Sequence, residues 1–153
     1  MTMSPTPGEL LAAHWSEMKG VAVRPSLGPA GINRLESRVG LTLPRDFKSY
    51  LLVADGFAAP SDQDLNGFRF WPSNEVALVD AFDGGRFASA DTATLLLFAD
   101  YLGWSWAYAI KVGSEGNSSV HIVGTVDGCP HRVADSFAEF AELYMTDDAR
   151  IYG

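Results

Sequence analysis

The chain has 153 residues, of which 47% are hydrophobic and 20% charged, so it can bury enough apolar surface to fold as one domain without disulfides. Its formal net charge of −8 excludes nucleic acid and anionic membranes as main partners, because both are bound through basic surfaces. This charge permits a basic protein partner, although an acidic surface can also serve solubility alone.

The expected compartment is the cytoplasm. The only cysteine, Cys129, cannot form a disulfide within the chain, and it lies in a turn sequence rather than in a cysteine-protease signature. The first residues lack the basic start and apolar run of a signal peptide, and no apolar run is long enough to cross a bilayer.

Helical patterns dominate the first third of the chain. Residues 1–8 are predicted to be a flexible tail, and a first helix begins at Glu9. A second helix is predicted to end at Gly40, and a third to run from Pro44 to Gly56. Apolar residues recur on one face of each of these helices, namely Leu11, Trp15 and Met18, then Ile32, Leu35 and Val39, then Phe47, Leu51 and Ala54.

Strand patterns follow over the middle of the chain. Short runs rich in aromatic and β-branched residues are predicted as strands at 67–72, 75–82, 94–98, 104–112 and 119–126. Residues 80–93 interrupt them as a loop with weak local order, and Ser136 and Glu139 form a capping box at the start of a C-terminal helix. The order predicts an α+β fold: a mostly antiparallel sheet of five or six strands, with N-terminal helices and a C-terminal helix packed on one face.

The stretch GWSWA at 103–107 differs by one residue from the Gly-x-Ser-x-Gly signature of serine hydrolases. That signature requires a strand, a sharp turn and then a helix. Here the residues around Ser105 alternate between large and small side chains, which predicts a central strand with Trp106 and Tyr108 on the same side. Ser105 is therefore placed in the middle of a strand and is not expected to be catalytic.

Other chemistry-bearing patterns are absent from the sequence. His14, His121 and His131 show no zinc-ligand spacing, and the glycine-rich segments lack a phosphate-binding motif. Paired carboxylates such as Asp147 and Asp148 lie in polar segments and are interpreted as solvated charges. We therefore expect no catalytic residue, no cofactor and no metal.

Three motifs resemble the SUKH superfamily, which includes bacterial immunity proteins and fungal regulators of cell-wall synthesis. The first is RLESRVGLTLPRDFKSYLLVADG at Arg34–Gly56, with its Leu-Glu pair, its Leu-Pro link and its aromatic helix. The second, VADSFAEFAELYM at Val133–Met145, resembles the final strand and helix of the family. The third, LLLFADYLGWSWAYAI, is similar to its central strand pair. The long loop at 80–93 and the N-terminal helix depart from the family pattern.

The resemblance implies a single SUKH-like domain that binds proteins without catalysis, and for bacterial members it implies neutralisation of a polymorphic toxin. Two alternatives remain open at this point. The chain could be a small hydrolase-like enzyme whose site converges only in space. It could also be a sensor with a small-ligand pocket lined by Trp71, Trp104 or Trp106.

A candidate partner-binding surface follows from the negative charge. Acidic residues in predicted loops and turns could contact a basic toxin domain, mimic phosphate and speed association. The candidates are Asp62, Asp64, Asp83, Asp100 and Asp127. The competing interpretation is that these charges only keep the protein soluble. The oligomeric state is not specified by any pattern in the sequence.

Overall fold

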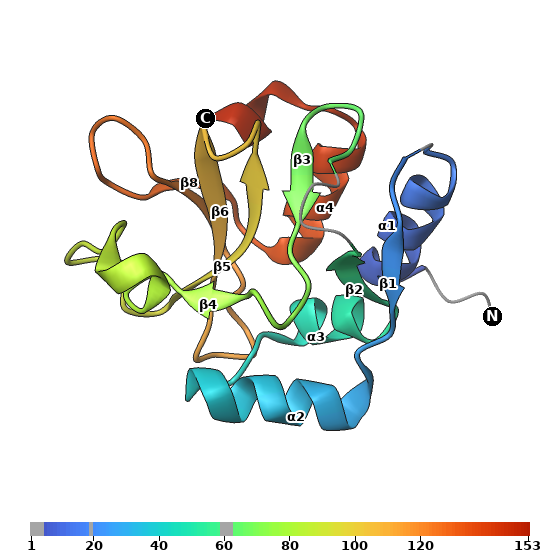
Figure 1. The fold of residues 1–153 in the computed structure, drawn as a ribbon, viewed down its shortest axis with the longest axis horizontal. Helices are drawn as coiled ribbons and strands as arrows, with labels where there is room; N and C mark the ends of the chain where they lie inside the picture. The colour runs from blue at the N-terminus through green and yellow to red at the C-terminus, as the bar shows by residue number, and fades with distance from the viewer. Residues whose placement is uncertain (1–4, 19, 59–62) are drawn as a thin grey trace.

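A computed structural model describes residues 5–18, 20–58 and 63–153. The fold is α+β, as predicted (Figure 1). The described helices are α1 (Pro7–Ser16), α2 (Gly28–Val39), α3 (Arg45–Leu51), α4 (Phe137–Met145) and the 3-10 turns η1 (Phe82–Gly85) and η2 (Ala149–Tyr152). The described strands are β1 (Val23–Pro25), β2 (Ala54–Phe57), β3 (Phe68–Phe70), β4 (Ala77–Leu78), β5 (Leu95–Tyr101), β6 (Trp106–Lys111), β7 (Val120–Val123) and β8 (His131–Ala134).

The main sheet has six strands, and every pairing in it is antiparallel. Its order is β3-β5-β6-β7-β8, with β4 also paired to β5. In Figure 1 α4 lies beside the sheet, α1 lies on the right, and η1 projects on the left. The predicted mostly antiparallel sheet is therefore confirmed.

The hydrophobic core lies between this sheet and the helices. Phe98 of β5 packs edge-on against Phe47 of α3 at 5.8 Å and against Phe140 of α4 at 5.4 Å, measured between ring centroids. Tyr108 of β6 packs against the same Phe140 at 5.2 Å. The side chains that alternate with these along the strands point to the opposite face of the sheet.

Helix α1 begins earlier than the sequence predicts. Thr6 accepts a hydrogen bond from the Glu9 backbone at 3.2 Å, and Glu9 accepts one from the Thr6 backbone at 3.1 Å, which completes a capping box. Pro7 and Gly8 are therefore helical, and the predicted tail is wrong for these two residues. Residues 1–4 lie outside the described part of the chain. At α4, Ser136 caps the helix as predicted, but the Glu139 carboxylate binds the backbone of Asp135 instead.

A second, two-stranded sheet was not predicted. Strand β2 pairs antiparallel with β1 at residues assigned by periodicity to the end of a helix. Helix α3 ends at Leu51, and Ala54 lies in the strand. The cause is long-range. Gly56 has a φ of 70°, and a Cβ atom there would lie 2.4 Å from the Trp71 carbonyl, so this glycine is needed for close packing against the main sheet.

The segment around Ser105 is a hairpin turn. Strand β6 begins at Trp106, so Trp104 and Ser105 belong to the turn after β5, and the placement of Ser105 in mid-strand is wrong. The Ser105 backbone N–H donates to the Tyr101 carbonyl at 2.9 Å and closes this turn. Trp106 and Tyr108 pair with neighbouring positions of β5 and lie on the same side, as predicted.

Candidate functional site: an aromatic cluster opposite the helices

Four aromatic side chains gather on the sheet face opposite α3 and α4. They are Trp71, Phe82, Phe87 and Trp104, and we call them the aromatic cluster. The Trp71 ring lies 5.6 Å from Phe82 and 5.1 Å from Trp104. Phe82, Phe87 and Trp104 are nearly parallel to one another, with centroids 5.2 to 6.1 Å apart. Trp71 is buried against Phe82 and Trp104, and the other three rings are only partly buried or exposed.

A buried carboxylate supports the cluster from the sheet. The indole Nε1 of Trp71 donates to Asp100 Oδ2 at 2.6 Å, and Asp100 is only 2% exposed. Burial raises the pKa of Asp100, and the Trp71 indole and the cation of Arg69, its cross-strand neighbour, oppose that shift. The backbone amide of Trp104 also lowers the pKa of Asp100. The carboxylate therefore faces both tryptophans of the cluster.

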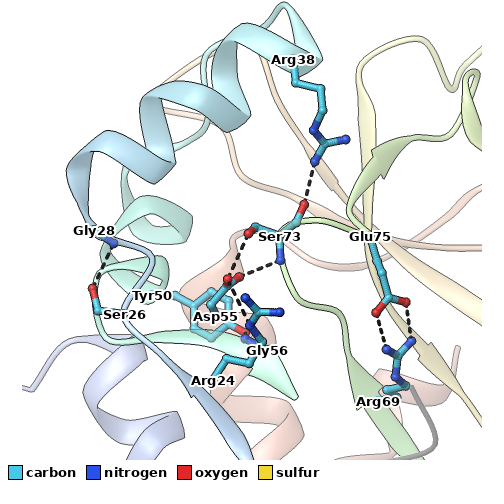
Figure 2. Close-up of polar contacts among 10 residues, drawn as sticks. All are labelled: Arg24, Ser26, Gly28, Arg38, Tyr50, Asp55, Gly56, Arg69, Ser73 and Glu75. Atoms are coloured by element: carbon cyan, nitrogen blue, oxygen red, sulfur yellow. Dashed lines mark hydrogen bonds and ion pairs between the residues drawn. The ribbon is translucent and has the colours of Figure 1, made fainter. Parts of the chain in front are cut away.

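The segment that carries Trp71 is held at several points (Figure 2). Asp55 of β2 accepts from the Ser73 backbone at 2.7 Å and from the Ser73 hydroxyl at 3.0 Å. Arg38 of α2 donates to the carbonyls of Ser73 at 2.6 Å and Val76 at 2.9 Å. The fork of Arg69 binds both oxygens of Glu75, at 2.9 and 2.6 Å.

These bonds join α2 and the small sheet to the bend after β3. They hold the backbone on both sides of Trp71 and so hold the base of the cluster in one position. Because two of these charged groups, Asp55 and Arg69, are buried and hydrogen-bonded, the bend is tied to the core and the cluster is preorganised relative to the sheet.

The exposed edge of the cluster has an unusual backbone. Leu102 and Trp104 have φ angles of 49° and 80°, in the left-handed region that large side chains rarely adopt. Such a conformation costs on the order of 1–3 kcal/mol and persists only where the surroundings impose it. Leu102 is 53% exposed and Trp104 is 40% exposed. The hairpin therefore bears a conformational cost while it presents two apolar side chains to solvent.

A hollow of about 230 Å³ adjoins the cluster. It is lined by Arg86, Phe87 and Ala88 on one side, and on the other by Gly124, Thr125 and Gly128 of the β7–β8 turn. In Figure 1 η1 and the β7–β8 turn both project on the left. Asp83 lies in η1 and Asp127 in that turn, so two of the predicted acidic residues lie on the segments that flank this hollow.

The remaining predicted acidic residues behave differently. Asp100 lies in strand β5 and Asp64 is 6% exposed, so neither presents its charge to solvent, and the placement of Asp100 in a turn is wrong. Asp64 accepts hydrogen bonds from the backbones of Asn66 and Phe68, both at 2.9 Å, and from the Tyr144 hydroxyl. Asp62 lies outside the described residues.

The described residues do not assemble a hydrolase site around Ser105. Its Oγ donates to the carbonyl of Leu102 at 3.3 Å, and the turn connects two antiparallel strands rather than a strand and a helix. Across residues 5–18, 20–58 and 63–153, no group of three or more His, Cys, Asp or Glu side chains is placed to hold a metal ion. The paired carboxylates Asp147 and Asp148 accept local hydrogen bonds, Asp147 from the Tyr152 hydroxyl and Asp148 from the Arg150 backbone at 2.9 Å.

The tryptophans named for a ligand pocket are divided between the two faces. Trp71 and Trp104 meet in the cluster, whereas Trp106 stacks on Tyr101 at 4.9 Å on the helix side. Trp106 lines a separate hollow of about 450 Å³ with Ile122, His131 and Arg132 among others. Two polar side chains of that hollow already have partners outside it, His131 with Asp127 and Arg132 with Asp135.

Phe82 and Phe87 were missed by sequence reasoning. They lie in the segment at 80–93 that was predicted as a weakly ordered loop, and their spacing matches no helix or strand period. The available signal was the presence of two phenylalanines in one long polar connection, because apolar side chains that gather into an exposed patch can mark an interaction site.

The SMI1 / KNR4 family (SUKH-1) matches residues 27–143, which is most of the chain. The chain belongs to this family. The match begins at the start of α2 and ends within α4, so it includes the main sheet and the aromatic cluster. No curated protein matches the chain.

Membership of the SUKH-1 family is consistent with a non-catalytic module of the immunity type. The match excludes α1 and β1, although Trp15 of α1 is fully packed against the family core. Within the described residues, the helices are all too short or too polar to cross a bilayer.

Proposed function

We propose that this SUKH-1 protein is a non-catalytic binding module of the immunity type, which neutralises a protein toxin by covering part of its surface. Family membership supports the general class. The aromatic cluster supports binding to a protein, because exposed tryptophan on a rigid scaffold is a typical anchor of protein interfaces. The large sheet supplies that scaffold.

The observation that carries this proposal is Trp104. A tryptophan with a φ of 80° and 40% exposure bears both a conformational and a solvation cost in the free protein. Covering the ring with a partner would recover the solvation part of that cost, on the order of 25 cal/mol for each Å² of apolar surface removed from water. Structural packing alone would place such a ring inside the core.

We further propose that the partner is basic. The chain carries a net charge of −8, and the segment between Asp80 and Asp91 adds three exposed aspartates against one arginine. Complementary potentials would steer a cationic toxin domain toward this side. Asp83 and Asp127 are the two candidates with exposed carboxylates, at 62% and 53% of their side-chain surface.

The proposed compartment is the cytoplasm, where an immunity protein must meet a toxin that has entered or been made in the cell. Cys129 is an exposed free thiol, which suits a reducing environment.

Growth protection tests the proposal. The protein product of the neighbouring gene, if it carries a toxic C-terminal domain, would be expressed in cells with and without this chain. We expect the chain to restore growth and to co-purify with that domain in a fixed ratio. Trp104→Ala should weaken both effects, whereas Leu10→Ala, which removes a 43% exposed side chain on α1, should not. Continued toxicity beside folded chain would rule out the immunity role.

A further inference from the structure

We propose that the aromatic cluster and the adjoining hollow bind an arginine side chain on a basic segment of the protein partner. This inference rests on the proposed function and specifies the chemistry of the same surface. The occupant would place a guanidinium against the exposed ring of Trp104 or at the mouth of the hollow beside Phe87, with its charge facing the aspartates of η1 and the β7–β8 turn.

The chain already holds one of its own arginines in this manner. The guanidinium carbon of Arg86 lies 5.1 Å from the centre of the Phe87 ring, and Arg86 Nη1 lies 3.7 Å from Asp83 Oδ2. The side chain remains 63% exposed, so this is a loose contact rather than a buried one. Aromatic rings attract guanidinium groups, and the same surface carries a second, larger ring at Trp104, which is 40% exposed.

The arrangement of rings favours a flat cation. Phe82, Phe87 and Trp104 lie within 18° of parallel, so together they present stacked planes rather than a closed apolar pocket. A planar guanidinium can stack on such a face and still direct its N–H groups outward to carboxylates. A lysine ammonium is more strongly hydrated and has no plane to stack, so it should bind less well.

Charge complementarity selects a cationic occupant over a neutral apolar one. Exposed aspartates are the predominant charges of the connection between β4 and β5: Asp80, Asp83 and Asp91 outnumber its one cation, Arg86, which pairs with Asp83. Across the hollow, Asp127 adds a further carboxylate, which also pairs with His131, and the hydrogen bonds it accepts from the Cys129 backbone and the Thr125 hydroxyl lower its pKa. Asp127 therefore stays ionised over a wide range of pH, and it holds the turn in shape.

Two blocked peptides can test this inference on the intact wild-type protein. One alternates arginine with glycine, and the other replaces each arginine with lysine at the same length and charge. Binding would be followed by NMR of the ¹⁵N-labelled chain at one fixed, low ionic strength. We expect the arginine peptide to shift the indole signal of Trp104 and the amides of residues 82–88 and 124–128, and to bind at least about threefold more tightly than the lysine peptide.

Variants locate the effect. Trp104→Ala should weaken binding of the arginine peptide about two- to fivefold, and Trp104→Phe should weaken it less, because a smaller ring face remains. Asp83→Asn with Asp127→Asn should also weaken it. The matched control is Glu17→Gln with Glu142→Gln, which removes the same charge from exposed positions just after α1 and on α4 and should have a smaller effect.

Equal affinity for the two peptides, shifts spread over the whole acidic surface, or no detectable binding would each overturn the inference. So would a control pair that weakens binding as much as Asp83→Asn with Asp127→Asn. These peptide-binding results do not decide whether the protein protects cells from the toxin, which the growth assay tests separately. A chain that protects cells equally well with Trp104→Ala would refute the arginine site and leave the immunity function standing. Failure of the folded wild-type chain to protect cells would refute the immunity function itself.

Discussion

Asp100 shows how a single buried residue can shape a surface. Its carboxylate accepts the Trp71 indole N–H, and the charges that face it are Arg69 and Glu75. Desolvation raises the pKa of Asp100, which means that the folded protein binds its proton more readily than the unfolded chain does. Keeping the Asp100 carboxylate ionised in this buried place therefore costs free energy. We attribute its presence to the hydrogen bond by which it positions Trp71, the base of the aromatic cluster.

This pKa shift predicts a particular pH dependence of stability. Between the unfolded value of 3.8 and the raised folded value, the folded state holds more protons, so the free energy of unfolding should fall as pH rises. Asp100→Asn removes this component while it keeps an oxygen for Trp71. Unfolding in urea should show the stability of the wild type gaining on that of the variant as pH falls through the folded pKa. A difference that stays constant with pH would contradict this.

Phe140 tests the core on the other face of the sheet. It contacts Phe98, Tyr108 and Phe137, and its side chain is fully buried. Phe140→Ala should lower the free energy of unfolding by about 3–5 kcal/mol, from lost burial and the cavity that remains. Phe47, Leu51 and Phe137 are buried in the same core and should cost similar amounts, within about 2–5 kcal/mol. Chemical denaturation would measure these changes in the free energy of unfolding. Losses well below this range would show that the helices pack only loosely on the sheet.

Ser105 gives a negative prediction at the same scale. Its hydroxyl is exposed, and its one described bond is to the Leu102 carbonyl. Ser105→Ala should therefore leave partner binding and stability within about 0.5 kcal/mol of the wild type. Titration with the partner would check binding, and loss of any activity on this change would revive the hydrolase interpretation.

At the scale of elements, α1 is more than an appendage to the family region. Its Trp15 packs on Phe57 at 5.1 Å and on Phe70 at 4.9 Å, and its indole donates to the Tyr144 hydroxyl at 2.8 Å. Tyr144 in turn donates to Asp64. An element outside residues 27–143 thus completes a buried hydrogen-bond chain that begins in α1 and ends before β3.

Removing α1 should therefore destabilise the domain even though the family match does not include it. Leu11 and Trp15 are both buried, and their burial corresponds to about 3–6 kcal/mol. A chain starting at residue 20 should melt well below the full chain in calorimetry. Leu10→Ala, on the exposed side of the same helix, provides the control and should change the melting temperature little. Equal melting temperatures for the truncated and full chains would show that α1 does not hold the core.

At the scale of the whole molecule, charge should control the rate of association. If the net charge of −8 steers a basic partner, the association rate should fall as the salt concentration rises from about 0.01 to 0.15 M. Over this range the Debye screening length shortens from about 30 to 8 Å. Stopped-flow measurements with the proposed toxin domain would show this. A rate independent of salt, and unchanged by Asp83→Asn with Asp127→Asn, would leave solubility as the role of the acidic charges.

The sequence by itself determined the class of the fold and most of its elements. The alternation at 106–111 and the motif residues Ser136 and Glu139 are local signals, because a strand face or a helix cap depends on near neighbours along the chain. The same holds for the family, whose motifs are short and occur in order. The period-two pattern also placed Trp106 and Tyr108 on one side correctly.

Only the tertiary structure decided which acidic residues are exposed and where the aromatic cluster lies. The sequence predicts Asp64 and Asp100 to be exposed charges in loops or turns. In the structure both are buried, and distant residues donate hydrogen bonds to them, Tyr144 to Asp64 and Trp71 to Asp100. The cluster joins the end of β3, the connection at 82–87 and a hairpin turn, none of which shares a period with another. Burial and contact depend on which segments meet in space, and β5 brings these segments together only once the sheet has formed.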